Sequence, residues 1–272
     1  MPHHFGRVGS RRTGCSNSHR FSSPAFPRLG CSLPLCFVSL LTRKSPTLLE
    51  TMPQSWNWPA VRMTVRVLLR QPSLAVPHVE VADIRQLDFR RLRAAGCEAV
   101  IFDKDNTLTV PYSDAIEPML VAALRECREA FDGRVAVLSN SAGTPDDPGH
   151  ATANRLERSL GVPVLRRPEK KPRGFESVRA HFGNVDPARL VMVGDRYLTD
   201  VTFGNLHGML CVRTAQLTSA GDNPVARAMH VFEVWLVALY RWLRVRPPPH
   251  RLLPIASEFA RIKAPVVRGR GD

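Results

Sequence analysis

The chain has 272 residues, of which 44% are hydrophobic and 23% are charged. This length allows one or two domains, and these proportions exclude a collagen, a wholly disordered chain and a polytopic membrane protein. The net charge of +14 is unevenly spread, because residues 1–49 carry six Arg, one Lys and no acidic residue. The basic excess is therefore concentrated in a terminal block.

Residues 1–55 have the composition of an organellar transit peptide. They are rich in Arg and Ser, and the first acidic residue is Glu50. Their longest uncharged run covers residues 29–42 and contains Pro34, whereas a membrane-spanning helix needs about 20 apolar residues. A secretory signal is the alternative, although the arginines between Arg11 and Arg28 are too dispersed for its compact basic region. We expect the mitochondrion, with the plastid as the alternative.

The six cysteines form no CxxC pair, and three of them lie in the presumed transit peptide. This spacing indicates neither a zinc site nor a disulfide framework. We expect Cys97, Cys127 and Cys211 to be small buried hydrophobic residues in a reducing compartment.

Residues 56–98 are expected to form an N-terminal, membrane-proximal helical segment. Arg62, Arg66 and Arg70 would lie on one face of a helix, with Trp56 and Trp58 just upstream. Such a helix suits the headgroup region of a membrane, and a surface helix packed on the domain is equally compatible. Further on, residues 83–96 predict a short helix that buries Leu87 and Leu92 and ends at Gly96.

Residues 99–223 alternate short apolar runs with helical stretches. The runs are AVIFD, RVAVL, VPVL, LVMVG and MLCVR. Continuous apolar runs separated by helices are typical of a parallel sheet covered on both faces. We therefore predict an α/β fold with a Rossmann-like sheet, in which ligands bind at the carboxyl ends of the strands.

Two carboxylates follow the first of these runs, at Asp103 and Asp105, with Thr107 two residues later. Residues at i and i+2 of a strand point the same way, and such close like charges raise the pKa of one of the acids. One carboxylate and one protonated acid suit covalent phosphoryl transfer. A divalent cation such as Mg²⁺ would relieve the repulsion.

Further polar residues follow the later strands. Ser139 and Asn140 offer a hydroxyl and an amide for phosphoryl oxygens. Residues 166–173 form a basic cluster in which Pro172 favours a helix start, so that Lys171 would lie at a helix N-terminus and bind an anion. Asp195 follows the glycine that ends the fourth run, and Asp200 lies about one turn later. Each of these short motifs alone is common in loops. An acid pair, a hydroxyl, a lysine and a further acid in this order after successive strands are not.

These motifs resemble the haloacid dehalogenase (HAD) superfamily, whose motifs are D-x-D-x-T, a strand-end Ser or Thr, a Lys and G-D-x-x-x-x-D. A narrower resemblance over residues 60–243 is to the mitochondrial phosphatidylglycerophosphatase family of yeasts, plants and algae. It rests on FDKDNTLT, LSNSAGT, GVPVLRRPEKKP and VMVGDRYLTDVTFGNLHG. That family often has His where this chain has Arg167, which puts any role of that His in doubt.

The resemblance implies a role for each matching residue. Asp103 would attack phosphorus, and Asp105 would act as general acid and then general base. Mg²⁺ would be held by Asp103, the Asp105 carbonyl and Asp195, with Asp200 in support. Ser139 would bind the transferred group and Lys171 would offset its charge, with Lys170 as the alternative lysine. The residues assigned to substrate binding are Thr107, Asn140, Arg167 and Lys170.

The gaps after Asp103 and after Ser141 are each too short for a cap domain, so a bulky substrate or its membrane must cover the site. Residues 224–246 predict an amphipathic helix. Arg227, His230, Glu233, Arg241 and Arg244 lie on one side and Phe232, Trp235, Leu236, Leu239, Trp242 and Leu243 opposite. This helix would lie in the plane of a membrane or pack on the domain. Residues 247–272 are expected to be an extended Pro-rich tail.

The resemblance therefore implies a Mg²⁺-dependent phosphatase that converts phosphatidylglycerophosphate to phosphatidylglycerol, for cardiolipin synthesis. It would be peripheral on the matrix side of the mitochondrial inner membrane. One alternative keeps the chemistry but acts on a phosphoprotein or a polynucleotide phosphate end. Another is a non-catalytic basic module that binds a membrane or nucleic acid, although no nucleic-acid-binding motif is visible. We expect a phospholipid substrate and no nucleic-acid partner.

Overall fold

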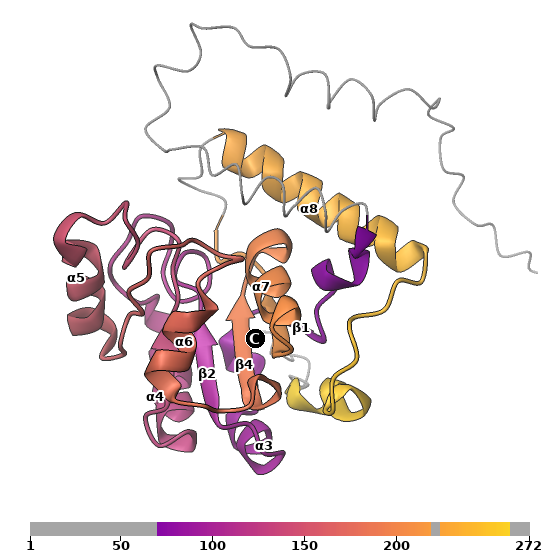
Figure 1. Cartoon of the computed structure of the whole chain (residues 1–272), viewed down its shortest axis with the longest axis horizontal. Coiled ribbons are helices and arrows are strands. Elements are labelled where there is room, and N and C mark those ends of the chain that lie inside the picture. The colour runs from indigo at the N-terminus through magenta and orange to yellow at the C-terminus, as the bar shows by residue number, and fades with distance from the viewer. Residues whose placement is uncertain (1–69, 219–223, 262–272) are drawn as a thin grey trace, which may run out of the picture. The chain divides into compact units, whose positions relative to one another are not determined.

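The computed structural model describes residues 70–218 and 224–261 (Figure 1). The chain divides into residues 1–53 and 54–272, and all described residues belong to the second unit. The α-helices are α3 (Phe89–Ala94), α4 (Val121–Ala130), α5 (Ala151–Leu160), α6 (Phe175–Phe182), α7 (Thr202–Leu206) and α8 (Pro224–Trp242). The strands are β1 (Val79–Val81), β2 (Ala99–Phe102), β3 (Val135–Val137), β4 (Leu190–Gly194) and β5 (Leu210–Thr214).

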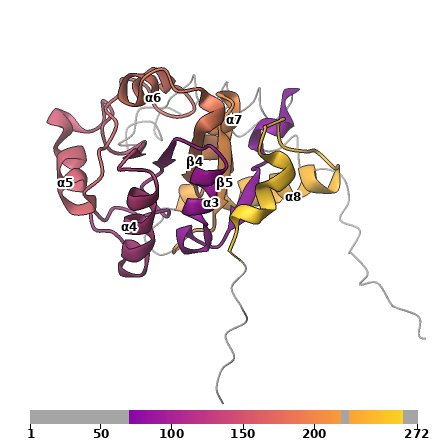
Figure 2. The same cartoon turned by 90° about the horizontal axis from the view of Figure 1, so that it is seen from below.

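The strands form one parallel sheet in the order β1-β5-β4-β2-β3. Successive residues of β2 point to opposite faces of the sheet, and both faces are buried. Val100 and Phe102 pack with α3, α4 and α5, whereas Ala99 and Ile101 pack with α6 and Phe203 of α7. Figure 2 shows α6 and α7 on one side of the sheet and α3 and α4 on the other. The predicted α/β fold, a parallel sheet flanked by helices, is confirmed.

Shorter helical turns connect these elements. A π-helical turn, η6 (Tyr197–Val201), leads directly into α7. The 3₁₀ turns are η1 (Pro72–Ala75), η2 (Ile84–Gln86), η3 (Pro118–Leu120), η4 (Pro148–His150), η5 (Pro187–Arg189) and η7 (Leu253–Phe259). Between β2 and β3 the chain forms η3 and α4, and residues 138–164 form η4 and α5, so no cap domain is inserted within residues 103–164.

Two expectations about the strands were wrong. The run VPVL forms no strand and makes a single bridge, between Val137 and Val164. Pro163 lies in this run and has no N–H to extend a ladder. The fifth strand is instead β1, in the segment that we expected to be helical. It pairs with β5 at an edge of the sheet, so its partner is distant in sequence.

The helix expected over residues 83–96 is divided in two. The turn η2 ends before Leu87, and α3 begins after Asp88, whose side chain accepts a 2.9 Å hydrogen bond from the Arg91 N–H as an N-cap. Leu87 and Leu92 are buried as expected, and Gly96 has a positive φ of 87° after the helix. Most of the predicted arginine helix lies outside the described residues. Outside them are Trp56, Trp58, Arg62 and Arg66.

The C-terminal residues that the structure describes are not an extended tail. Leu252, Ala256 and Phe259 are buried in the main hydrophobic core. The Phe259 carbonyl accepts a 2.9 Å hydrogen bond from the Asp88 N–H, and Leu87 forms a bridge with Ala260. The proline run Pro247 to Pro249 is typical of an extended tail, but the apolar residues after it complete the core beside α3.

Helix α8 also packs differently from the expected arrangement. Its buried face contains Glu233, Leu236, Val237 and Tyr240. Opposite it, Val231, Trp235 and Trp242 are 67%, 61% and 77% exposed. Glu233 was expected on the solvent face, but donors in the loop after β4 allow its burial. Among the described residues, no helix is long and apolar enough to cross a membrane.

The three described cysteines, Cys97, Cys127 and Cys211, are free and buried. Burial raises the pKa of each thiol, so each is held in its neutral form. Their expected role as small core residues is confirmed.

Candidate active site

The carboxyl ends of β2, β3 and β4 meet because these strands are neighbours in register. The Asp103 N–H donates a 2.8 Å hydrogen bond to the Val193 carbonyl, and the Leu138 N–H donates one of 2.8 Å to the Phe102 carbonyl. Asp103 and Asp195, which directly follow β2 and β4, and Ser139, two residues after β3, are therefore brought to one edge of the sheet.

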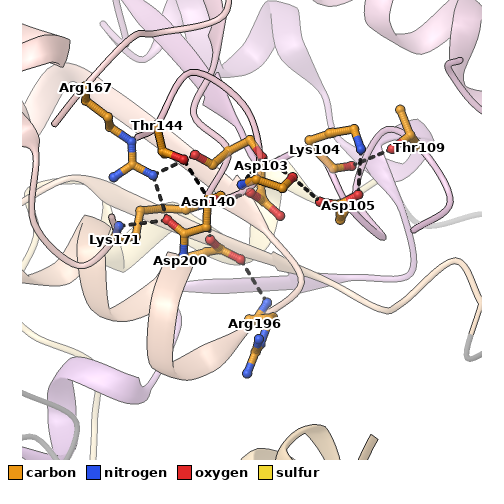
Figure 3. A network of polar contacts seen from close by, with 12 residues as sticks. Asp103, Lys104, Asp105, Thr109, Asn140, Thr144, Arg167, Lys171, Arg196 and Asp200 are labelled. Atoms are coloured by element: carbon orange, nitrogen blue, oxygen red, sulfur yellow. Dashed lines mark hydrogen bonds and ion pairs between the residues drawn. The ribbon is translucent and has the colours of Figure 1, made fainter. Parts of the chain in front are cut away.

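Three buried carboxylates and one buried lysine form the centre of the site, and Figure 3 shows two of these carboxylates, Asp103 and Asp200, with Lys171. Oxygens of Asp103, Asp195 and Asp200 lie within 4.8 Å of one another. The Nζ of Lys171 donates hydrogen bonds of 2.5 Å to Asp103 Oδ1 and to Asp200 Oδ1. The sequence-predicted residues Asp103, Asp195, Asp200 and Lys171 thus lie together.

Burial and mutual repulsion control the charges of this cluster. Burial raises the pKa of Asp103 to about 7, with Lys171 opposing the shift and the Asp200 and Asp105 carboxylates adding to it. The pKa of Asp195 is also raised, by burial and then by its two acidic neighbours. Burial disfavours the charged form of Lys171, but the Asp103 and Asp200 carboxylates outweigh it and raise the pKa of the lysine. The lysine is therefore held as a cation between two acids.

The oxygen atoms of this cluster fit a hard divalent cation. Asp195 Oδ1 is buried and has no hydrogen-bond partner. A buried carboxylate oxygen without a donor is costly unless a cation is supplied. Carboxylate oxygens are the donors that Mg²⁺ prefers, and this cluster offers three of them within 4.8 Å of one another. The side chains that would hold it are those of Asp103, Asp195 and Asp200.

Gly194 allows Asp200 to reach this position. A Cβ atom at Gly194 would lie 2.5 Å from Cβ, Cγ and Oδ2 of Asp200, a distance that real contacts essentially never show. Asp200 Oδ2 also accepts a 3.1 Å hydrogen bond from the Arg196 N–H. The glycine before Asp195 is thus required by the close approach of the second acid of the motif.

Asp105 lies beside this cluster and is held by a separate set of donors. Lys104 Nζ donates a 2.8 Å hydrogen bond to its Oδ1, and Ser141 Oγ donates one of 2.8 Å to its Oδ2. Ser141 Oγ also lies 2.9 Å from the Oγ of buried Ser139. Strand β2 ends at Phe102, so the i and i+2 argument from strand geometry does not apply to Asp103 and Asp105. Sequence reasoning missed Lys104 and Ser141, although both lie within the quoted motifs.

Arg167 and Asn140 hold the loop that carries Lys171. Arg167 Nη2 donates to the Ser139 carbonyl (2.8 Å) and to Asn140 Oδ1 (2.7 Å), and its Nη1 donates to the carbonyls of Glu169 and Arg173. Burial lowers the pKa of Arg167 to about 10. These contacts give Arg167 and Asn140 a structural role in this loop, and the substrate contact expected of them from the sequence stays a prediction.

The two candidate lysines have different surroundings. Asn140 Oδ1 accepts a 2.8 Å hydrogen bond from the Lys171 N–H, which fixes this residue at the strand end. Lys170 instead forms an ion pair with Asp146, outside the carboxylate cluster. Lys171 does not begin a helix, because residues 171–173 form a turn and α6 starts at Phe175. It therefore reaches the site through its side chain.

Thr107 lies in the turn that follows Asp103. Its side chain is buried, and its hydroxyl has no hydrogen-bond partner. Its N–H donates a 3.3 Å hydrogen bond to the Lys104 carbonyl within the turn that follows Asp103. The role of Thr107 in substrate binding stays a prediction.

A family model described as mitochondrial PGP phosphatase matches residues 60–217. The chain is 45% identical over 213 residues to phosphatidylglycerophosphate phosphatase 1, chloroplastic, of Chlamydomonas reinhardtii, covering 77% of this chain and 78% of that protein. It is 39% identical to the chloroplastic/mitochondrial protein of that name from Arabidopsis thaliana, covering 77% and 60%. The mitochondrial phosphatidylglycerophosphatase of Saccharomyces cerevisiae is 30% identical, with 59% and 88% covered. The chain therefore belongs to the mitochondrial PGP phosphatase family.

Proposed function

We propose that this chain is a Mg²⁺-dependent phosphatase that hydrolyses phosphatidylglycerophosphate to phosphatidylglycerol and phosphate. The observation that carries the proposal is the position of Asp103, at the end of β2 in hydrogen-bond contact with Lys171 and beside Asp195 and Asp200. A carboxylate held beside a buried cation is arranged to receive a phosphoryl group. The names of the relatives supply the substrate.

In the first step Asp103 attacks phosphorus, and the bond from phosphorus to the glycerol oxygen breaks. Asp105 protonates that leaving oxygen, which releases phosphatidylglycerol and leaves an aspartyl-phosphate on Asp103. Lys104 and Ser141 orient Asp105 through hydrogen bonds to its two carboxylate oxygens. The nucleophile Asp103 and the acid Asp105 are therefore held by different hydrogen-bond donors.

In the second step water attacks the phosphorus of the aspartyl-phosphate. Asp105 now takes the proton from that water, and the bond from phosphorus to the Asp103 oxygen breaks to release phosphate. Lys171 offsets the charge of the transferred group in both steps, and Ser139 donates a hydrogen bond to it. Mg²⁺, when bound by the three buried carboxylates, supplies further stabilisation of the phosphoryl charge.

The site lacks a cap domain within residues 103–164, and this favours a bulky substrate. Charge stabilisation by Lys171 is stronger when water is excluded, so something must cover the strand ends during turnover. A lipid in its bilayer brings such a surface with it.

Helix α8 supports association with a membrane surface. Val231, Trp235 and Trp242 form one exposed stripe opposite its buried face, and Arg244 and Arg246 are exposed near its C-terminal end. Tryptophan beside basic residues suits the boundary between anionic headgroups and acyl chains. We propose that this stripe rests on the membrane that contains the substrate.

We place this peripheral association on the matrix side of the mitochondrial inner membrane, with a plastid membrane as the alternative. The Arg-rich, acid-free composition of residues 1–49 supports an organelle, and the relatives are named chloroplastic or mitochondrial. In that compartment the product would feed the synthesis of cardiolipin.

The test is phosphate release by the purified full-length chain from phosphatidylglycerophosphate in mixed micelles, with Mg²⁺ or with EDTA. Soluble phosphomonoesters, a phosphopeptide and a 5′-phosphorylated oligonucleotide are assayed in parallel. We expect Mg²⁺-dependent turnover of the lipid that far exceeds turnover of the other substrates. Faster turnover of the peptide or the oligonucleotide than of the lipid would refute the lipid as substrate. No turnover of any substrate would refute the assignment of the chain as a phosphatase.

A further inference from the structure

Glu233 is a fully buried acid, and it lies on α8 rather than on a strand of the site. Its Oε1 accepts a 2.7 Å hydrogen bond from Arg196 Nη2. Its Oε2 accepts hydrogen bonds from the Tyr197 N–H (3.0 Å) and the Leu198 N–H (3.4 Å). A single carboxylate therefore binds three donors from consecutive residues.

These three residues lie between two of the carboxylates that would hold the cation. Arg196 directly follows Asp195, and its N–H binds Asp200 Oδ2 at 3.1 Å. The first N–H groups of a helix have no partner within it, and Arg196, the N-cap residue of η6, supplies none from its side chain. Glu233 supplies that partner from α8. It thus fixes the start of the turn that presents Asp200.

Glu233 also determines where the positive charge of Arg196 lies. The Arg196 guanidinium follows Asp195 in the chain, in reach of an acidic cluster that has one buried oxygen, Asp195 Oδ1, without a partner. In the structure this guanidinium is paired with Glu233 instead. Without that partner the guanidinium would be drawn toward Asp195 and Asp200, where it would compete with a divalent cation.

We propose that Glu233 is a positioning residue that holds Arg196 and the η6 turn so that Asp195 and Asp200 are available to the cation. This inference rests on the Mg²⁺ site of the proposed function. Helix α8 would then have two roles. Its exposed stripe would contact the membrane, and Glu233 on its buried face would position the loop between Asp195 and Asp200.

The test uses Glu233→Gln, Arg196→Gln and the double variant in the full-length chain. Mg²⁺ affinity is measured by isothermal titration calorimetry without substrate, and by the melting temperature in Mg²⁺ and in EDTA. Glu233→Gln keeps the side-chain size but frees the Arg196 charge, so we expect Mg²⁺ affinity to fall about 10- to 100-fold. The double variant removes both charges, and we expect it to recover most of the affinity.

Glu80→Gln is the matched control. Glu80 accepts a 2.7 Å hydrogen bond from the Tyr197 hydroxyl and pairs with Arg241 of α8, so it joins the same two elements without touching Arg196. We expect Mg²⁺ affinity within about twofold of wild type for this variant. A merely structural role of Glu233 would lower the melting temperature equally in Mg²⁺ and EDTA and would leave the affinity unchanged.

Several outcomes would overturn the inference. They are unchanged Mg²⁺ affinity in Glu233→Gln, an equal loss in Glu80→Gln, a double variant no better than Glu233→Gln, or a wild-type chain that binds no Mg²⁺. If Glu233→Gln does not fold, the test is made with the double variant, and Mg²⁺ affinity far below that of wild type in the double variant would overturn the inference. A wild-type chain that binds Mg²⁺ but hydrolyses no phosphatidylglycerophosphate would refute the proposed function alone, because the binding measurements need no substrate.

Discussion

The ends of β2 and β4 bury charged side chains, whereas the outer face of α8 exposes large apolar ones. Asp103, Asp195 and Asp200 are buried, and Trp235 and Trp242 are 61% and 77% exposed. Both regions reverse the usual partition of a folded chain and carry a cost in free energy. The difference lies in what would offset that cost, a cation and a phosphoryl group in one case and a lipid surface in the other. The two regions can therefore be disabled separately.

The largest effect is expected from removing the charge of the nucleophile. Asp103→Asn should lower turnover of phosphatidylglycerophosphate at least about a thousandfold, because the amide cannot attack phosphorus. Asp105→Asn should act similarly through loss of the proton donor. Both variants should fold, as circular dichroism can verify, and both should bind vesicles like wild type. Loss of vesicle binding in either variant would break the separation of the two regions.

A smaller effect is expected from the lysine of the cluster. Lys171→Met should lower turnover about 100- to 1000-fold, because the charge that offsets the phosphoryl group is lost. It should also lower the melting temperature, since Asp103 and Asp200 would lose their shared ion-pair partner.

Lys170→Met is the matched control for that variant. Its ion pair with Asp146 is partly exposed, so its loss should cost about 1 kcal/mol or less and leave turnover nearly unchanged. Equal losses of turnover in the two variants would contradict the assignment of Lys171 to the site.

Removal of the cation should affect stability as well as activity. At a Mg²⁺ concentration of about 100 times its dissociation constant, binding should stabilise the folded chain by about 2.7 kcal/mol relative to EDTA. The melting temperature measured by differential scanning calorimetry should rise accordingly. Asp195→Asn should abolish most of that rise, and an undiminished rise would place the cation elsewhere.

The smallest effect on chemistry is expected from α8. The double variant Trp235→Ser and Trp242→Ser should weaken binding to anionic vesicles at least about tenfold, because each exposed indole contributes apolar area at the interface. Hydrolysis of a soluble phosphomonoester should change by less than about twofold. Met119→Ser is the control, since Met119 is an exposed apolar residue of the turn η3 rather than of α8. If Met119→Ser weakened vesicle binding as much as the double tryptophan variant does, the role of α8 in membrane binding would be refuted.

The sequence predicted the features of the fold that depend on local pattern. Strands β2, β3 and β4 are continuous apolar runs and β5 begins as one, and the site residues follow from the rule that ligands lie at strand ends. Asp103, Asp195 and Asp200 are close together because β2 and β4 pair in register. For these residues, knowing which strands are parallel is nearly sufficient.

The sequence did not predict the features that depend on contacts between distant segments. Strand β1 is only three residues long and is defined by its pairing with β5. Phe259 follows a proline-rich stretch and is nevertheless buried beside α3. Glu233 lies on the polar side of a helical wheel, and only the donors of Arg196, Tyr197 and Leu198 make its burial favourable. A periodic pattern cannot reveal such partners.

The central claim is that Asp103 accepts a phosphoryl group from a lipid. The most direct measurement is an acid quench during turnover of phosphatidylglycerophosphate labelled in its terminal phosphate, followed by digestion and identification of the labelled peptide. We expect label on the peptide that contains Asp103 in the wild-type chain, and in Asp103→Asn no label and turnover at least about a thousandfold lower. Label on another residue, or an unchanged turnover rate in Asp103→Asn, would contradict it.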